Sequence, residues 1–130
     1  MFNSVARTPR RGRLRILCAE DNPEIGDILV RLLARQGHVA RHARDGREAW
    51  DILSRDLGAF DLVVTDHHMP VLGGADLVGL LRQARFAGRI IVYSSSLLSP
   101  ERARYELLGV NSIVEKSAVA AELIAAVEGS

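Results

Sequence analysis

The chain has 130 residues, enough for one domain with a core of its own, and its apolar share of 48% and charged share of 25% are typical of a globular protein. A single cysteine excludes an intrachain disulfide. No apolar run approaches the roughly 20 residues of a membrane-spanning helix, and no stretch resembles a secretory signal, so we expect a soluble cytoplasmic protein.

Positive charge is concentrated at the start of the chain. Residues 1–15 carry five arginines and no acid, which leaves 12 basic residues against 16 acids in the rest. Together with Thr8-Pro9 and Gly12, this composition predicts a disordered basic arm over residues 1–12 and a folded domain over residues 13–130. Five charges without an aromatic residue are weak grounds for recognition of a nucleic acid, so we do not expect a nucleic-acid partner.

Beyond the arm, short apolar runs alternate with stretches whose apolar residues recur at helical spacing. The runs predict strands over residues 14–19, 38–43, 62–66, 89–93 and 112–115. The periodic stretches predict helices over residues 23–36, from 46 onward, over 75–85, over 99–108 and after 117. The expected N-terminal caps of these helices are Asn22, Asp45, Ser99 and Ser117.

This alternation of five strands with five helices, joined by short connections, predicts an α/β fold with a doubly wound, five-stranded parallel sheet, (βα)5. Right-handed crossovers leave few arrangements, and the flavodoxin-like strand order 2-1-3-4-5 suits five such units. The strand over residues 38–43 is the more polar one and is expected at an edge of the sheet.

Polar residues stand where four of the predicted strands end: Glu20, Asp21, Asp66, Ser94 and Lys116. Because the carboxyl ends of parallel strands share one edge of the sheet, we expect these side chains to lie close together. Clustered carboxylates repel one another unless a cation joins them, and oxygen ligands suit Mg²⁺. Zinc bound by His67 and His68 is not expected, because adjacent residues on an extended segment point apart and no third soft ligand is in view.

Lys116 is the single lysine among 17 basic residues. A compact ammonium group can enter a small pocket and contact one phosphate oxygen, where a planar guanidinium would be crowded. With Mg²⁺ and Lys116 to neutralise charge and Ser94 to donate a hydrogen bond, the strand ends suit phosphoryl transfer, and Asp66 is the candidate nucleophile. The alternatives stay open: Lys116 as a capping charge, Ser94 as a turn residue, and Asp66 as a solvated loop acid or helix cap.

The segments ILCAEDN (16–22), DLVVTDHHMPVLGG (61–74) and IIVYSS (90–95), followed by Lys116, resemble the receiver domains of bacterial two-component response regulators. The resemblance extends from about Leu14 to the end, so that residues 13–130 would form the receiver domain. It implies the following roles for the site residues: Asp66 as phosphoacceptor, Asp21 as direct Mg²⁺ ligand, Glu20 as ligand through water, the backbone carbonyl of His68 as a further ligand, and Ser94 and Lys116 as contacts of the phosphoryl group.

The same resemblance implies the partners. The phosphoryl donor would be a phosphohistidine on a sensor histidine kinase or a histidine phosphotransfer domain. The output would go to a downstream protein or to an effector domain in a parent chain, and a phosphorylation-dependent dimer stays open. Such a domain is a signalling module that catalyses only its own phosphorylation and dephosphorylation, and no membrane partner is implied.

Three positions depart from the family pattern. Ser117 stands where the family usually has a proline after its lysine, Ile113 where it has an aromatic residue, and Gly73 where it has an aspartate. A cis bond before Ser117 would cost about 2.5–4 kcal/mol, so we expect either a different loop after Lys116 or a trans bond there. These departures support an alternative, a pseudo-receiver that binds a protein partner without phosphorylation. A flavin-binding relative is less favoured, because Glu20 and Asp21 would repel a phosphate that lacks a metal.

The first predicted helix contains a glycine, Gly26, in its interior. An interior glycine destabilises a helix by about 1 kcal/mol relative to alanine, so it calls for a reason. Close approach of a partner helix beside Gly26 and Val30 is one hypothesis, and the family resemblance implies kinase contact on this helix. Mere tolerance of the glycine is the alternative.

Overall fold

Five strands form one parallel sheet in the computed structural model, which describes residues 12–116 and 119–129. The strands are β1 (Arg15–Ala19), β2 (Val39–Ala43), β3 (Leu62–Asp66), β4 (Arg89–Ser94) and β5 (Ser112–Glu115). Their order is β2-β1-β3-β4-β5, with every neighbouring pair parallel, which confirms the predicted doubly wound topology and the edge position of the second strand. All but the last residue of the expected arm over residues 1–12, and the expected cap at Ser117, lie outside the described residues.

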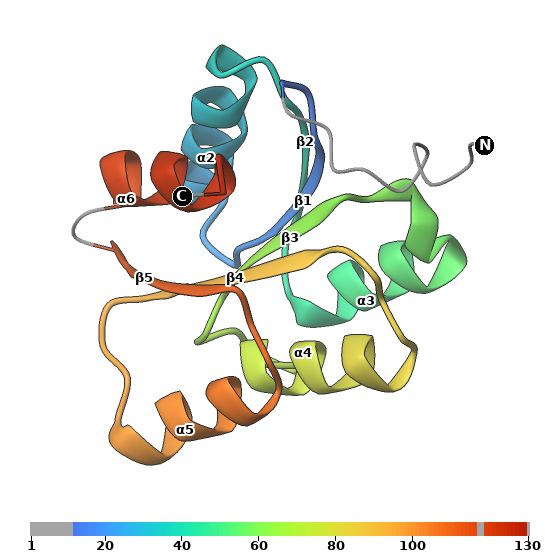
Figure 1. Ribbon diagram of the computed structural model, residues 1–130, viewed down its shortest axis with the longest axis vertical. Helices are drawn as coiled ribbons and strands as arrows, with labels where there is room; N and C mark the ends of the chain where they lie inside the picture. The colour runs from blue at the N-terminus through green and yellow to red at the C-terminus, as the bar shows by residue number, and fades with distance from the viewer. Residues whose placement is uncertain (1–11, 117–118, 130) are drawn as a thin grey trace.

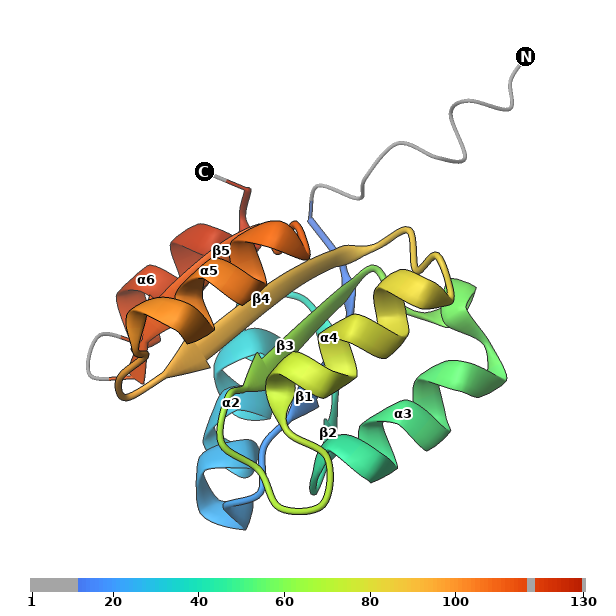
Figure 2. The same cartoon turned by 90° about the horizontal axis from the view of Figure 1, so that it is seen from below.

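Helices cover both faces of this sheet. They are α2 (Pro23–Arg35), α3 (Gly46–Arg55), α4 (Gly74–Gln83), α5 (Ser99–Leu107) and α6 (Val119–Val127), with a 3₁₀ turn, η1 (Leu57–Ala59), after α3. Helices α2 and α6 lie on one face, and α3, α4 and α5 lie on the other (Figure 1). The view from below shows α3, α4 and α5 side by side across their face (Figure 2). Over the ranges described, none of the helices combines the length and the apolar character needed to cross a membrane.

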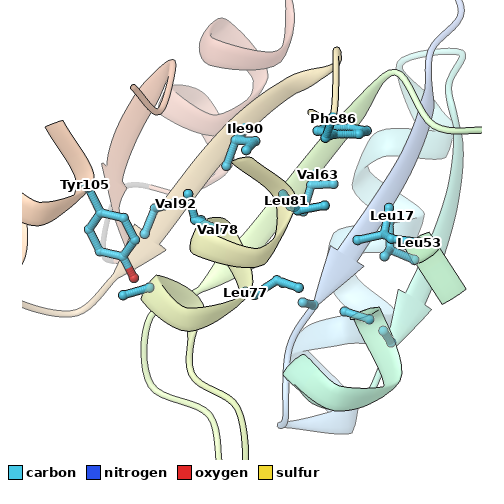
Figure 3. Packing of buried hydrophobic residues seen from close by; sticks show 14 residues of the cluster. Leu17, Leu53, Val63, Leu77, Val78, Leu81, Phe86, Ile90, Val92 and Tyr105 are labelled. Atoms are coloured by element: carbon cyan, nitrogen blue, oxygen red, sulfur yellow. The ribbon is translucent and has the colours of Figure 1, made fainter. Parts of the chain in front are cut away.

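The central strand β3 is buried along its whole length, as expected of a parallel strand covered on both sides. Side chains alternate between two buried apolar clusters. The cluster under α3, α4 and α5 includes Leu17, Val63, Leu81 and Tyr105 (Figure 3). The cluster under α2 and α6 includes Cys18, Val64, Tyr93 and Leu123. Because β3 is packed on both faces, its last residue, Asp66, lies at the end of a fully buried strand.

Capping interactions explain where the helices before the site begin. The side-chain oxygen of Asn22 accepts hydrogen bonds from the backbone nitrogens of Glu24 and Ile25 at 2.9 and 3.2 Å, and that of Asp45 accepts one from the nitrogen of Glu48 at 2.8 Å. Both predicted caps are therefore confirmed. Each satisfies backbone donors that the first helical turn leaves unpaired.

The start of α5 differs from the prediction. Ser99 is not the cap but the first helical residue, and the cap position is Leu98. A carboxylate oxygen of Glu101 accepts a hydrogen bond from the backbone nitrogen of Leu98 at 2.8 Å. Glu101 thus supplies the acidic half of a capping box, whereas no side chain at the cap position accepts a hydrogen bond from the first turn, as a serine there would.

The reason for Gly26 lies inside the molecule. Gly26 is buried, and a Cβ atom placed on it would lie 2.2 Å from the Cε1 and Nε2 atoms of the His42 ring. The ring comes from β2, and its Nε2 bonds the backbone oxygen of Glu20 at 2.7 Å. Close approach does require the glycine, but the approaching group is His42 and not a partner helix. The hypothesis that Gly26 allows a partner helix to approach α2 therefore loses this support.

Candidate functional site

Three carboxylates meet at the carboxyl edge of the sheet. Glu20 follows β1, and Asp66 ends β3, the adjacent strand. Glu20, Asp21 and Asp66 each offer one oxygen such that the three oxygens lie within 4.8 Å of one another. Glu20 and Asp66 are buried, whereas Asp21 is exposed. The fold thus brings together acids that are far apart in the sequence, and leaves one side of the group open to solvent.

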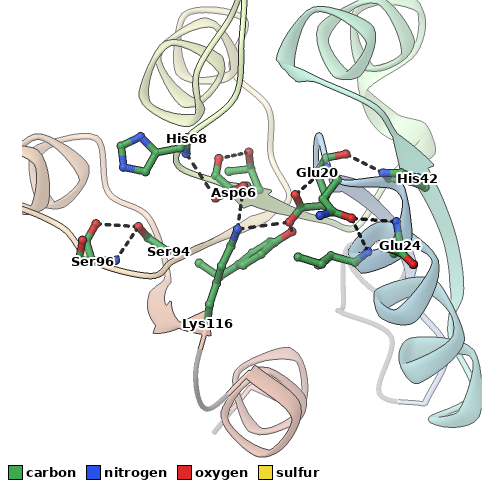
Figure 4. A network of polar contacts seen from close by, with 12 residues as sticks. Glu20, Glu24, His42, Asp66, His68, Ser94, Ser96 and Lys116 are labelled. Carbon is green, nitrogen blue, oxygen red and sulfur yellow. Dashed lines mark hydrogen bonds and ion pairs between the residues drawn. The ribbon is translucent and has the colours of Figure 1, made fainter.

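Lys116 supplies positive charge to this group from the end of β5. Its Nζ lies 3.0 Å from Oδ2 of Asp66 and 3.6 Å from Oε1 of Glu20 (Figure 4). Burial by itself would lower the pKa of Lys116, but the hydrogen bond and the charge of Asp66, with the charge of Glu20, outweigh it and raise that pKa. The side chain therefore stays an ammonium ion near neutral pH and offsets part of the repulsion among the acids.

The carboxyl group of Glu20 is held on both oxygens. Its Oε1 accepts a hydrogen bond from the hydroxyl of Tyr93, and its Oε2 accepts one from the backbone nitrogen of Asn22 at 2.9 Å. Burial nevertheless raises the pKa of Glu20 above its ordinary value, since it outweighs these two bonds. Burial and the bond to Glu20 likewise raise the pKa of Tyr93, so its hydroxyl remains a donor.

Ser94 lies at the same edge but is engaged elsewhere. It is buried, and its hydroxyl donates to the backbone oxygen of Ser96 at 2.8 Å and accepts from the nitrogen of Ser96 at 3.3 Å. Both bonds stay within the loop that Ser94 begins, as those of a turn serine do. A contact with a phosphoryl oxygen would require Ser94 to exchange this partner.

The two histidines after Asp66 take different paths. The backbone nitrogen of His68 donates to Oδ1 of Asp66 at 3.3 Å. His67 turns toward α5, where its Nδ1 lies 2.5 Å from the hydroxyl of Tyr105 and its Nε2 lies 2.8 Å from a carboxylate oxygen of Glu101. The expectation that the two rings point apart is wrong, because their centroids lie 4.6 Å apart, edge to face.

One group of side chains has the composition and spacing to hold a metal ion, among the residues that the structure describes (12–116 and 119–129). It consists of Glu20, Asp21 and Asp66. This donor set consists of hard oxygen atoms without imidazole or thiolate, which fits Mg²⁺ and not zinc. The backbone carbonyl of His68 as a further ligand stays a prediction.

Sequence reasoning missed the residues that support the site from behind, chiefly Tyr93, His42 and Tyr105. Strand register was the available signal for Tyr93, because it pairs with Asp66 in the β3–β4 ladder. It is a phenol that directly follows the apolar run from Ile90 to Val92, beside the candidate nucleophile. His42 and Tyr105 gave no comparable signal, since their contacts depend on where α2 and α5 lie over the sheet.

Known proteins share this sequence pattern and fold. The family described as the response regulator receiver domain matches residues 16–128. The chain is 32% identical over 127 residues to a gliding motility regulatory protein of Myxococcus xanthus, covering 96% of this chain and 16% of that protein. It is 31% identical over 114 residues to the response regulator RppA of Synechocystis sp., covering 86% of this chain and 48% of that protein.

Among solved structures, a response regulator receiver protein from Pseudomonas putida superposes with a TM-score of 0.82 at 27% identity, covering 91% of this chain and 98% of that one. The match thus spans nearly all of that solved chain but less than half the length of the two curated relatives above. Sequence, topology and the acid cluster at the strand ends lead to one conclusion: this chain belongs to the receiver domains of two-component response regulators.

Proposed function

We propose that this chain is a phosphoacceptor receiver domain, in which Asp66 takes a phosphoryl group from a phosphohistidine. The observation that carries the proposal is the contact of Lys116 Nζ with Asp66 Oδ2 at 3.0 Å, inside a group of three carboxylates whose oxygens lie within 4.8 Å. An acid that is merely solvated would not be buried beside an ammonium ion and two further acids. Within the proposal, residues 13–130 are the receiver domain and residues 1–12 an arm.

In the transfer, a carboxylate oxygen of Asp66 forms a bond to phosphorus as the bond between phosphorus and the donor imidazole nitrogen breaks, and that nitrogen keeps the electron pair. Lys116 can move from Asp66 to an equatorial phosphoryl oxygen, since its ammonium already lies within 3.0 Å of the attacking group. Mg²⁺ held by Glu20, Asp21, Asp66 and the carbonyl of His68 would neutralise charge on the phosphoryl oxygens. Ser94 would exchange its bond to Ser96 for one to the phosphoryl group.

The partners follow from this chemistry. The donor is a phosphohistidine, carried by a sensor histidine kinase or a histidine phosphotransfer domain. The acceptor of the signal is a downstream protein or an effector domain of a parent chain, and the protein works in the cytoplasm as a signalling module and not as a metabolic enzyme. Support for an effector domain comes from the relatives, which are longer than the region they share with this chain.

The test is covalent modification of Asp66. Wild-type protein incubated with Mg²⁺ and a small phosphodonor should gain one phosphoryl group by intact-protein mass spectrometry, and beryllofluoride should perturb the same site by NMR. Asp66→Asn should abolish both responses. Asp51→Asn, on the exposed surface of α3, is the matched control and should respond as the wild type does. Phosphate on another residue, or on the Asp66→Asn variant, would overturn the assignment.

A pseudo-receiver, which binds a protein partner without phosphorylation, is the second candidate. Its support is the sequence at Ile113 and Ser117, where the aromatic residue and the proline expected of the family are missing. It predicts a wild type that stays unmodified and shows no response to beryllofluoride. The two candidates therefore give opposite results in the same experiment.

A further inference from the structure

A buried tyrosine lies behind the acidic group. The side chain of Tyr93 belongs to the cluster under α2 and α6 and is fully buried. Its hydroxyl donates to Oε1 of Glu20, and its ring centroid lies 5.3 Å from Nζ of Lys116. Lys116 in turn contacts Asp66 (Figure 4). Tyr93 therefore contacts both a carboxylate and the ammonium group of the site.

We propose that Tyr93 is a positioning residue of this site: its hydroxyl fixes the carboxylate of Glu20 for Mg²⁺, and its ring supports the ammonium group of Lys116. The inference rests on the proposed function in one respect, namely that the acid group binds Mg²⁺. It goes beyond that function by assigning a role to a residue that does not itself bind the metal or the phosphoryl group.

The carboxylate of Glu20 is fixed in its orientation by two hydrogen bonds. A carboxylate held by one hydrogen bond can still rotate, whereas Glu20 is held on Oε2 by the nitrogen of Asn22 and on Oε1 by Tyr93. Residues that hold a metal ligand in this way raise its affinity for the metal, because the ligand needs no reordering when the metal binds. Glu20 is fully buried, so water offers no ready substitute for the phenolic donor.

The ammonium group of Lys116 lies over the ring of Tyr93. An ammonium ion within about 6 Å of an aromatic ring centroid is attracted by the negative face of the ring. At 5.3 Å from its centroid, Nζ of Lys116 lies over the Tyr93 ring and within this range. The ring can therefore keep Lys116 near the site when its contact with Asp66 is exchanged for one with a phosphoryl oxygen.

A purely structural tyrosine is the competing explanation, because a buried phenol usually finds some hydrogen-bond partner. The two explanations differ in what the hydroxyl controls. A structural hydroxyl contributes to stability alone. A positioning hydroxyl also sets the affinity of the site for Mg²⁺, and the chemical shift of its own proton changes when Mg²⁺ binds.

Two variants separate these roles. Tyr93→Phe removes the hydroxyl at Glu20, and Ile91→Val removes one methyl group from the same strand and the same buried cluster without touching a polar group of the site. MgCl₂ is titrated into each protein, without a phosphodonor, while NMR follows the amides of residues 20–22 and 66–68. We expect Tyr93→Phe to weaken Mg²⁺ binding by about tenfold. Ile91→Val should keep the wild-type affinity.

A second measurement uses the wild type and needs no folded variant for its result. The hydroxyl proton of Tyr93, buried and bonded to a carboxylate, should give a downfield proton resonance with nuclear Overhauser contacts to the ring of Tyr93. This resonance should shift as Mg²⁺ binds. A resonance that does not respond to Mg²⁺, or wild-type Mg²⁺ affinity in a folded Tyr93→Phe variant, overturns the inference. Equal weakening in both variants overturns it as well.

These results are distinguishable from failure of the proposed function. A wild type that binds Mg²⁺ with the expected difference between variants, yet takes no phosphoryl group, counts against phosphotransfer and leaves Tyr93 as a positioning residue. Normal phosphorylation with unchanged Mg²⁺ affinity in Tyr93→Phe counts against Tyr93 alone. A wild type without any Mg²⁺ response overturns the metal site and the role of Tyr93 together.

Discussion

The hydroxyl group of Tyr105 lies 2.5 Å from Nδ1 of His67, the residue that follows Asp66. The other ring nitrogen of His67 bonds Glu101, whose second carboxylate oxygen accepts the backbone nitrogen of Leu98. The bonds from Leu98 and His67 hold the pKa of Glu101 below its usual value. A continuous series of hydrogen bonds thus joins the residue beside the candidate phosphoacceptor to the first turn of α5.

Tyr105→Phe tests this connection. Losing the hydroxyl leaves a ring nitrogen of His67 without its partner, which should lower the free energy of unfolding by about 1 kcal/mol. It should also speed amide hydrogen exchange over residues 98–105, because the loop after Asp66 no longer contacts α5 through the phenol. Hydrogen exchange followed by NMR measures this. Exchange over these residues that matches the wild type, in a variant of lowered stability, would mean that the series of bonds does not hold α5.

Lys116→Ala should separate metal binding from phosphotransfer. Removing an ammonium ion 3.0 Å from Asp66 leaves more negative charge for Mg²⁺, so Mg²⁺ should bind more tightly. Phosphorylation should slow, because nothing replaces the ammonium at the phosphoryl oxygens. Mg²⁺ titration by NMR and phosphorylation by mass spectrometry check the two halves. Arg102→Ala on the exposed surface of α5 is the control and should change neither. Weaker Mg²⁺ binding in Lys116→Ala would contradict the prediction.

The raised pKa of Glu20 predicts how stability changes with pH. The folded protein holds this proton more tightly than the unfolded chain does, chiefly because of burial, so ionisation of Glu20 disfavours folding. Protonated Glu20 therefore stabilises the folded protein. This stabilisation is complete below the ordinary carboxyl pKa of about 4.3, and it is lost as the pH rises through the raised pKa of Glu20. Glu20→Gln cannot ionise, so its stability relative to wild type should rise with pH over that interval.

Urea unfolding without metal, on both sides of that interval, measures this difference. The exposed Glu106→Gln variant is the control and should follow the wild type at every pH. Added Mg²⁺ should stabilise the wild type more than Glu20→Gln, because it binds the ionised acids. Parallel pH profiles for wild type and Glu20→Gln would show that Glu20 titrates alike in the folded and unfolded chains.

Gly26→Ala tests the packing of α2 against β2. Alanine would normally stabilise a helix interior by about 1 kcal/mol, but here its Cβ would lie 2.2 Å from the His42 ring. The ring must move and give up its bond to the oxygen of Glu20, so we expect a net loss of about 1 kcal/mol. In a His42→Ala background the same change should become stabilising. Urea unfolding of the four proteins measures this reversal, and its absence would refute the packing explanation.

The side chain of Ile113 bears on where phosphorylation should change the structure. It is half-buried and packs against the cluster under α3, α4 and α5, and a β-branched side chain has little freedom to switch rotamer. Tyr93 cannot replace an aromatic switch there, because it points to the opposite face and bonds Glu20. We expect the larger change in residues 94–99 and 116–119. Hydrogen exchange with and without beryllofluoride decides this, and a rearrangement centred on Ile113 would contradict it.

The architecture could be predicted from local sequence because the signals were local. Apolar runs, helical spacing, and the caps at Asn22 and Asp45 each depend on a few neighbouring residues. Parallel strands with right-handed crossovers then bring every strand end to one edge, which is why Glu20, Asp66 and Lys116 were expected together. The start of α5 escaped this reasoning, because Glu101 caps it from within the helix and Ser99 is one residue too late.

Contacts between elements were decided only in the tertiary structure. Whether Gly26 faces a partner or His42 depends on the distance between α2 and β2, which no local pattern states. Tyr93, His67 and Tyr105 are ordinary residues in the sequence. They gain their roles when strand register sets a phenol beside Glu20 and when α5 lies within hydrogen-bonding distance of His67. Sequence periodicity determines which face a side chain takes, whereas the atom it meets there depends on packing between elements distant in the chain.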